Sequence, residues 1–262
     1  MATVTTQPQT IAEEDRRIKG EGTPEATWQG WARLAALPEV DPAELVPFGA
    51  RAVVIAPHPD DEVLGTGGLL ALLSEISRSV LIIAVTDGTA SHPKSTQWPP
   101  DRLASVRPLE TREALQRLHM RQVQVVRLGL QDGGAKQFEA NLSGLLSKYL
   151  QPDDIVFTTW RYDGHPDHEA TGRAAYEAAS AARLPLIEVP LWTWHWASPD
   201  DPRVPWSRAR RVVLDGATHA RKVRAVQAFR SQIESDPATG KAPVLPEHVL
   251  ARLTRPYEVI LI

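Results

Sequence analysis

The sequence contains no cysteine among its 262 residues. Disulfide bonds, thiolate nucleophiles and sulfur ligands are therefore excluded, and any metal site must be built from nitrogen and oxygen donors. The chain also has no apolar run long enough to cross a bilayer, and residues 1–15 lack the basic and apolar regions of a secretory signal. These absences predict a cytoplasmic protein with no membrane association.

Neither positive nor negative charge is in large excess, because the formal net charge is only -3. Such a chain has no field that would gather nucleic acid or an anionic membrane, so neither is expected as a partner. The length supports one substantial core, and residues 23–262 are predicted to form a single domain. Residues 1–22 offer few apolar groups to bury and are predicted to be a flexible tail. The sequence leaves open whether the protein is a homo-oligomer.

Segments rich in β-branched residues alternate along the chain with segments of helical periodicity. Strands are predicted over residues 51–56, 79–86, 122–128, 154–159 and 257–262, and helices over 63–76, 106–118, 138–150 and 217–233. A further amphipathic helix is predicted over residues 23–37, where tryptophan and leucine recur at helical spacing. The alternation predicts an α/β fold that is Rossmann-like, with a mostly parallel sheet and helices on both faces.

Two short patches combine histidine with carboxylate residues. Ala56-Pro57-His58-Pro59-Asp60-Asp61-Glu62 follows the first predicted strand, and Gly164-His165-Pro166-Asp167-His168-Glu169 follows the fourth. Ligands of such sheets bind beyond the carboxyl ends of the strands, so we expect the two patches to meet. Two imidazoles and one carboxylate would form a three-ligand metal site with an open coordination position.

An open metal site of this kind suits hydrolysis. A bound divalent ion lowers the pKa of its water from about 15.7 toward roughly 7, and a free carboxylate beside it accepts the proton. A histidine that is not a ligand can stabilise the oxyanion or protonate the departing nitrogen. The spacing leaves open which of the adjacent Asp60 and Asp61 binds the metal, and which histidine has which role.

The two patches resemble the two signature motifs of the PIG-L/LmbE-like zinc-dependent N-deacetylases. By this resemblance, His58, Asp61 and His168 hold Zn2+. It also implies that Asp60 is the general base and that His165 stabilises the oxyanion and assists the leaving amine. The nitrogen and oxygen donors are equally compatible with Fe2+, Co2+ or Mn2+.

The resemblance extends from about residue 51 to residue 182, and it implies contact with substrate for Arg107, Asp132 and Asp163. The first fifty residues have no counterpart in it. The implied activity is removal of an N-acetyl or other N-acyl group from an amino sugar or related small conjugate, by attack of a metal-bound water. Two alternatives stay open: the same centre catalyses another water-addition reaction, as in a hydratase or another amidase, or the metal is structural in a non-catalytic binding module.

Several other features favour packing over function. Trp192, Trp194 and Trp196 alternate with polar residues, and an extended backbone would place their indoles on one side, against a core or subunit interface. The glycines in residues 65–68 favour close helix–sheet packing, because they lie inside the predicted helix. The basic run over residues 203–211 is interpreted as solvated surface. Residues 90–100 are too many for a simple connection and are predicted to form a lid or pocket wall.

Overall fold

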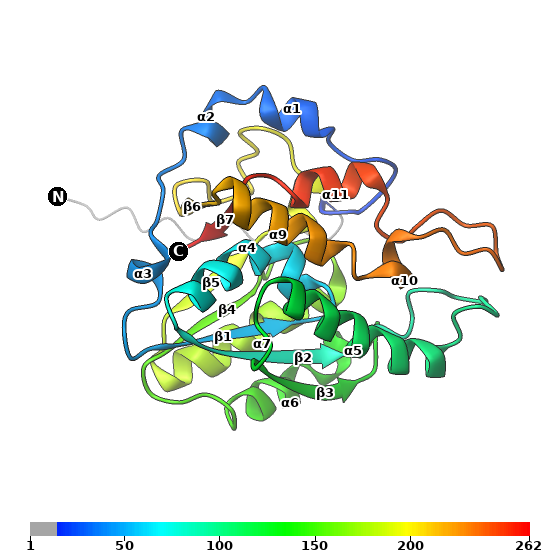
Figure 1. Cartoon of the computed structure of the whole chain (residues 1–262), viewed down its shortest axis with the longest axis horizontal. Helices are drawn as coiled ribbons and strands as arrows, with labels where there is room; N and C mark the ends of the chain where they lie inside the picture. Colours follow the sequence, from blue (N-terminus) through cyan, green and yellow to red (C-terminus); the bar gives the residue numbers. More distant parts are fainter. Residues whose placement is uncertain (1–14) are drawn as a thin grey trace.

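A computed structural model describes residues 15–262 (Figure 1). These residues form one seven-stranded sheet in the order β3-β2-β1-β4-β5-β7-β6. β1 to β5 are parallel, whereas β7 runs antiparallel to both of its neighbours. The predicted α/β fold with a mostly parallel sheet is confirmed. The strands are β1 Arg51–Ala56, β2 Ser79–Thr86, β3 Gln124–Leu130, β4 Asp154–Thr159, β5 Leu186–Val189, β6 Ala209–Val213 and β7 Tyr257–Leu261.

Helices cover both faces of the sheet, and successive side chains of β1 pack against the helices of opposite faces. Val54 packs in the same cluster as Leu70 and Ala225, whereas Val53 and Ile55 pack with Leu142. The helices are α1 Glu25–Gln29, α2 Ala32–Ala35, α3 Pro42–Leu45, α4 Asp61–Glu75, α5 Pro100–Arg117, α6 Ala135–Leu146, α7 Pro166–Ala182, α8 Thr193–Trp196, α9 Gly216–Val226, α10 Arg230–Ile233 and α11 Glu247–Leu253.

The chain changes direction across the sheet between β1 and β4. From β1 it passes through α4 to β2 on one side, and from β4 it passes through α7 to β5 on the other. The carboxyl ends of β1 and β4 are therefore neighbours at the point where a parallel α/β sheet forms its ligand crevice. Both histidine-rich patches follow these two strands.

α4 packs closely on its neighbours through glycines, as the sequence predicted. A Cβ atom added at Gly65 would lie 2.9 Å from Val189 of β5, and one added at Gly68 would lie 2.5 Å from Leu214. Neither position has room for a methyl group, so the glycines bring the helix against the sheet layer. This contact fixes the axis of the helix whose first residue is Asp61.

Three predictions about the outer segments need correction. The helix predicted over residues 23–37 is two short helices, α1 and α2, and the one predicted over 217–233 breaks between α9 and α10. Part of the basic run interpreted as solvated surface forms β6, whose Ala209 and Val212 are buried while Arg210 and Arg211 are half-buried. An antiparallel edge strand tolerates two arginines among apolar residues because only some of its side chains face the core.

Residues 1–14 of the predicted flexible tail lie outside the described residues. Within residues 15–22, Arg16 is only 2% exposed and pairs with Glu169. This pairing offsets the entropy lost when the polar segment is ordered.

The tryptophans at 192, 194 and 196 do not lie on an extended strand, because residues Thr193–Trp196 form the helical turn α8. Their indoles therefore point in different directions. Trp194 packs in the core with its ring centroid 5.0 Å from that of Trp28, which brings α1 onto the domain. Packing was thus the correct interpretation for Trp194, although the predicted backbone was wrong.

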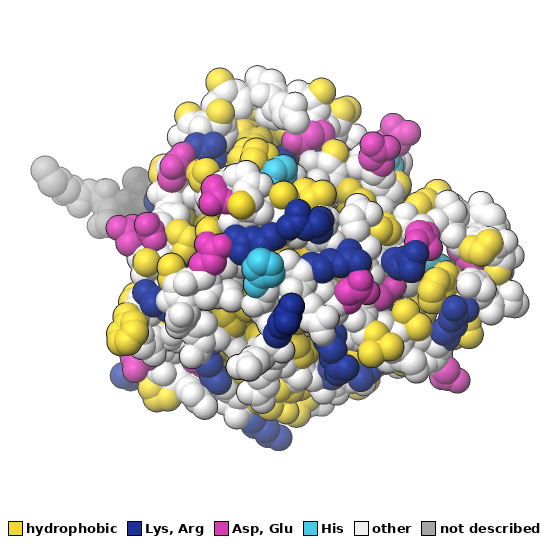
Figure 2. Space-filling model, in the orientation of Figure 1, with side chains coloured by type: hydrophobic (Ala, Val, Ile, Leu, Met, Phe, Trp, Pro, Cys, Tyr) yellow, Lys and Arg dark blue, Asp and Glu magenta, His cyan; other side chains and the backbone are white. Residues whose placement is uncertain are grey.

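Figure 2 shows a band of basic side chains across the face over α5 and α9, with acidic side chains beside it. Arg117 pairs with Glu113 in α5, and Arg221 of α9 pairs with Glu75 of α4. These two arginines are therefore each paired with a carboxylate. Within residues 15–262, no helix has the length and apolar character needed to span a membrane.

Candidate metal centre

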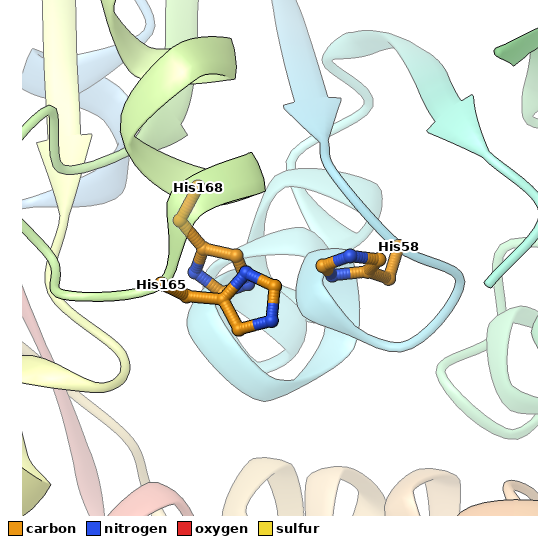
Figure 3. Close-up of side chains that lie close together, drawn as sticks. All are labelled: His58, His165 and His168. Atoms are coloured by element: carbon orange, nitrogen blue, oxygen red, sulfur yellow. The ribbon is translucent and has the colours of Figure 1, made fainter. Parts of the chain in front are cut away.

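Three imidazole rings meet where β1 and β4 end (Figure 3). His58 lies in the loop between β1 and α4, whereas His165 and His168 lie at the beginning of α7. One ring nitrogen from each of the three lies within 4.8 Å of the others. Pro166 begins α7, and His165 caps it by accepting a hydrogen bond from the backbone amide of Asp167. The predicted meeting of the two patches is confirmed.

Asp61 stands between two of these imidazoles. Its Oδ2 atom lies 3.1 Å from Nδ1 of His58 and 3.2 Å from Nε2 of His168. Ligand atoms around a tetrahedral Zn2+ with bonds of about 2.0–2.1 Å lie roughly 3.3 Å apart. In addition, Nε2 of His168 is a buried atom with no hydrogen-bond partner in the described part of the chain. The donor set of His58, Asp61 and His168 therefore fits a divalent cation.

The far nitrogen of each of these two imidazoles faces a carboxylate. Nδ1 of His168 lies 2.8 Å from Oδ2 of Asp163, and Nε2 of His58 lies 3.3 Å from both Asp132 and Asp167. A ring nitrogen that donates its hydrogen to a carboxylate leaves the other nitrogen free to bind a metal. The carboxylates thus orient the rings with their free nitrogens toward Asp61.

The carboxylates of the centre stabilise the protonated, positively charged forms of His58 and His168. Burial alone would lower the pKa of His168, but Asp61 and Asp163 outweigh it and raise the pKa to about 9. Burial likewise opposes the protonation of His58, yet its carboxylate partners raise its pKa well above the usual value. Burial and the adjacent His168 and His58 lower the pKa of His165 to about 3, so that this ring is neutral near pH 7.

Asp60 differs from its neighbour Asp61. Its backbone has φ 138°, a strained conformation for a residue with a side chain. Burial raises the pKa of Asp60 to about 7, although Arg107 opposes this effect. Nη2 of Arg107 lies 3.0 Å from Oδ2 of Asp60 and 2.6 Å from the carbonyl oxygen of Pro59. A carboxyl group with this pKa is suited to exchange protons near neutral pH.

A cavity of about 220 Å³ opens onto these groups. Of the eight predicted site residues, Asp163 alone does not line it: this residue is fully buried, and its side chain accepts hydrogen bonds from the backbone amides of residues 191–193. Arg107 lines the cavity although two of its nitrogens are bound to protein oxygens. Of residues 90–100, which were predicted to form a lid or pocket wall, Ala90 and Ser91 line the cavity. The lining residues are His58, Asp60, Asp61, Leu64, Ala90, Ser91, Arg107, Asp132, Gly133, His165, His168, Leu191, Trp192, Gln232, Val244, Leu245 and Leu253.

Sequence reasoning gave no role to Asp167, although it lies inside the second patch. Its Oδ2 atom accepts the amide of Gly133 at 2.7 Å and faces His58, and its Oδ1 atom accepts the amide of Ala135. Asp167 therefore joins α7, the beginning of α6 and the first patch. The only signal in the sequence was its place between two histidines, which is equally typical of helix capping.

Comparison with known proteins places this centre in context. The profile of the family described as PIG-L: GlcNAc-PI de-N-acetylase matches residues 53–179. A probable N-acetyl-alpha-D-glucosaminyl L-malate deacetylase 2 from Bacillus cereus is 27% identical over 145 residues, which are 53% of this chain and 64% of that protein. A diacetylchitobiose deacetylase from Thermococcus kodakarensis is 26% identical over 137 residues, 52% of this chain and 51% of that protein. The chain thus matches between half and two thirds of the length of these relatives.

Among solved structures, N,N'-diacetylchitobiose deacetylase from Pyrococcus horikoshii superposes with a TM-score of 0.56 at 21% identity, over 79% of each chain. This likeness supports the fold. Both patches, and every residue of the cavity wall from His58 to His168, lie within the residues that the family profile matches.

Proposed function

From the match of residues 53–179 to the PIG-L family profile, we propose that the protein is a zinc-dependent hydrolase that removes an N-acetyl group from an amino sugar or related small conjugate. The curated relatives are deacetylases by name. The observation that carries the proposal is that one cavity collects three candidate ligands together with Asp60 and His165. We further propose a cytoplasmic location.

His58, Asp61 and His168 would hold the ion, with Fe2+, Co2+ or Mn2+ as other candidates. A divalent cation bound there supplies Lewis acidity, which polarises an amide carbonyl and lowers the pKa of water. Nε2 of His168 supports this assignment, because this buried ring nitrogen makes no hydrogen bond within the described residues and lies 3.2 Å from the candidate ligand Asp61.

Asp60 would act as the general base. It lines the cavity beside Asp61, and its Oδ2 atom is held by Arg107 at 3.0 Å. Its pKa of about 7 lets the carboxylate accept a proton from water and pass it to the departing nitrogen. Arg107 also holds the carbonyl oxygens of Pro59 and Gly88, so it fixes the loop in which Asp60 lies.

His165 would stabilise the negative charge that develops on the amide oxygen. Its Nδ1 atom accepts the amide hydrogen of Asp167, so the neutral ring carries its own hydrogen on Nε2. A neutral donor of fixed orientation stabilises an oxyanion in a site shielded from water. Asp132, which also lines the cavity, is proposed to contact the substrate; Asp163 is proposed to orient His168 instead.

The test is a panel of N-acetylated compounds: N-acetylglucosamine, N,N'-diacetylchitobiose and glycosides of N-acetylglucosamine. The zinc-loaded protein should release acetate from at least one of them. Asp60→Ala should reduce this rate by about 10²–10⁴-fold and leave the zinc content unchanged, whereas Asp200→Ala, an exposed control, should behave as the wild type. Complete absence of acetate release overturns the proposed activity, and a normal rate for Asp60→Ala overturns the proposed base.

A further inference from the structure

The segment 15–23 forms a strap that crosses the domain beside the second patch. It is fastened to α8 and α11 through its backbone. The amide of Thr23 donates to the carbonyl of His195, and Arg252 donates to the carbonyls of Glu21 and Thr23 at 3.0 and 2.7 Å. These bonds fix the course of the strap without using the cavity, so its side chains are available for other contacts.

Arg16 of the strap forms a buried two-pronged ion pair with Glu169 of α7. Its Nε lies 2.7 Å from Oε1 and its Nη2 lies 3.0 Å from Oε2. The side chains are 2% and 6% exposed. Arg173 lies farther away, 3.7 Å from Oε2, and its guanidinium is engaged with Glu139. Glu169 is therefore held mainly by the strap, in the geometry that gives arginine–carboxylate pairs their specificity.

The same carboxylate holds the turn that leads to His165. Oε1 of Glu169 accepts the backbone amide of Gly164 at 2.9 Å. Gly164 has φ +95°, and a Cβ atom there would lie 2.6 Å from the carbonyl oxygen of Arg16 and 2.7 Å from Trp196. The turn is thus enclosed between the strap and α8, and it is tied to the strap through Glu169.

We propose that Arg16 is a positioning residue for His165, acting through Glu169 and the Gly164 amide. This inference rests on the proposed function of His165. The ion pair sets the conformation of Gly164, and this conformation sets where the adjacent imidazole lies in the cavity. His168 lies one turn inside α7 and is held by Asp163, so the strap acts on His165 far more than on the metal ligands.

The strap lies outside residues 53–179, the part of the chain that the family profile matches. The turn before His165 is therefore packed against an N-terminal segment that the family profile does not match. A displacement of about 1 Å at a catalytic group is enough to lower turnover by roughly 10²-fold.

The experiment compares Arg16→Ala, Arg16→Lys and Glu169→Gln with Arg33→Ala in the full chain. Arg33 is a matched control because it forms an exposed ion pair with Asp200 in the same N-terminal region. Hydrogen exchange of the Gly164 amide is measured first, since it needs no substrate. Zinc content, kcat and KM are then measured on the substrate that the panel identifies.

We expect faster exchange at Gly164 in all three test variants but not in Arg33→Ala. We also expect kcat to fall about 10–100-fold, with KM within about threefold and zinc content unchanged. Arg16→Lys keeps the charge but loses the two-pronged geometry, so it should recover only part of kcat.

Unchanged exchange in Arg16→Ala overturns the inference. Faster exchange with normal kcat overturns the link to His165, and loss of zinc in step with kcat assigns the strap to metal binding instead. If no substrate of the panel is hydrolysed, the exchange data still decide whether Arg16 holds the turn, and the proposed function fails separately.

Discussion

Nδ1 of His168 lies 2.8 Å from Oδ2 of Asp163, a carboxylate with no exposed surface. The backbone amides of Leu191, Trp192 and Thr193 hold this carboxylate, and Nε1 of Trp196 donates to the Asp163 carbonyl. α8 and the chain before it therefore fix Asp163, and Asp163 fixes the ring of His168. The orientation of one candidate ligand thus depends on a segment about thirty residues away.

Asp163→Asn should weaken zinc binding by about 10–100-fold. The amide NH2 group can face Nδ1 of His168, which moves the ring hydrogen to Nε2, the nitrogen that would bind the metal. The dissociation constant is measured by competition with a chromogenic chelator, with circular dichroism to verify folding. Asp200→Asn, an exposed control, should bind zinc as the wild type does. An unchanged affinity in folded Asp163→Asn would show that this carboxylate does not orient the ligand.

Removal of the metal should lower the thermal stability of the wild type, because an ion that binds only the folded chain stabilises it by mass action. Dialysis against a chelator should lower Tm, and added Zn2+ should restore it. His168→Ala should abolish this zinc-dependent shift. His248→Ala is the control, because His248 is exposed and does not line the cavity, and this variant should keep the shift. A full zinc-dependent shift in His168→Ala would exclude His168 as a ligand.

The sequence was sufficient for four of the five parallel strands, β1 to β4, and for the meeting of the two patches. The predicted bounds of β1, β2 and β4 match the structure, and each of these strands has a run of apolar residues at its centre. His58 lies in the loop that follows β1, and His168 lies in the first turn of the helix that follows β4. The two histidines can therefore be predicted to meet at the point where the strand order reverses, and this prediction needs no knowledge of tertiary contacts.

What the sequence did not reveal depends on contacts between distant residues. β5 has only four residues, and β6 contains two adjacent arginines among three apolar residues, so neither has a strong local pattern. Arg16 lies in a polar segment, and its partner Glu169 is 153 residues later in the chain. Asp163 looked like a cleft residue because of its position beside the second patch. Its burial follows from the fold of residues 191–193, which no local pattern indicates.

Lys222 and Glu258 form a buried ion pair against α4, with Nζ 2.7 Å from Oε1. Glu258 also accepts the amides of Gly68 and Leu69, and Lys222 donates to the carbonyl of Leu64. Lys222→Met should destabilise the fold by about 3–5 kcal/mol, because it leaves a buried carboxylate without its cation. Urea denaturation measures the change.

The double variant Lys222→Met with Glu258→Gln distinguishes charge from packing. It should be at least about 1 kcal/mol more stable than Lys222→Met alone, because it removes the unpaired charge and keeps an acceptor for the helix amides. Lys148→Met, an exposed control, should change stability by less than about 0.5 kcal/mol. If the second substitution adds to the loss instead, the pair acts through shape and not through charge.

Two glycines inside helices should respond in opposite directions to the same substitution. At Gly68 of α4 a Cβ atom would lie 2.5 Å from both terminal carbons of Leu214, so Gly68→Ala should destabilise the fold by about 1–3 kcal/mol through overpacking. At Gly144 of α6 nothing lies within 4 Å of the added atom and the residue is exposed. Gly144→Ala should therefore stabilise the fold by about 0.5 kcal/mol, since alanine loses less backbone entropy in a helix. Urea denaturation of both variants gives the two signs. A stabilising effect at Gly68 would mean that Leu214 moves aside at little cost, and then the close packing of α4 would not be what sets the direction of the helix behind Asp61.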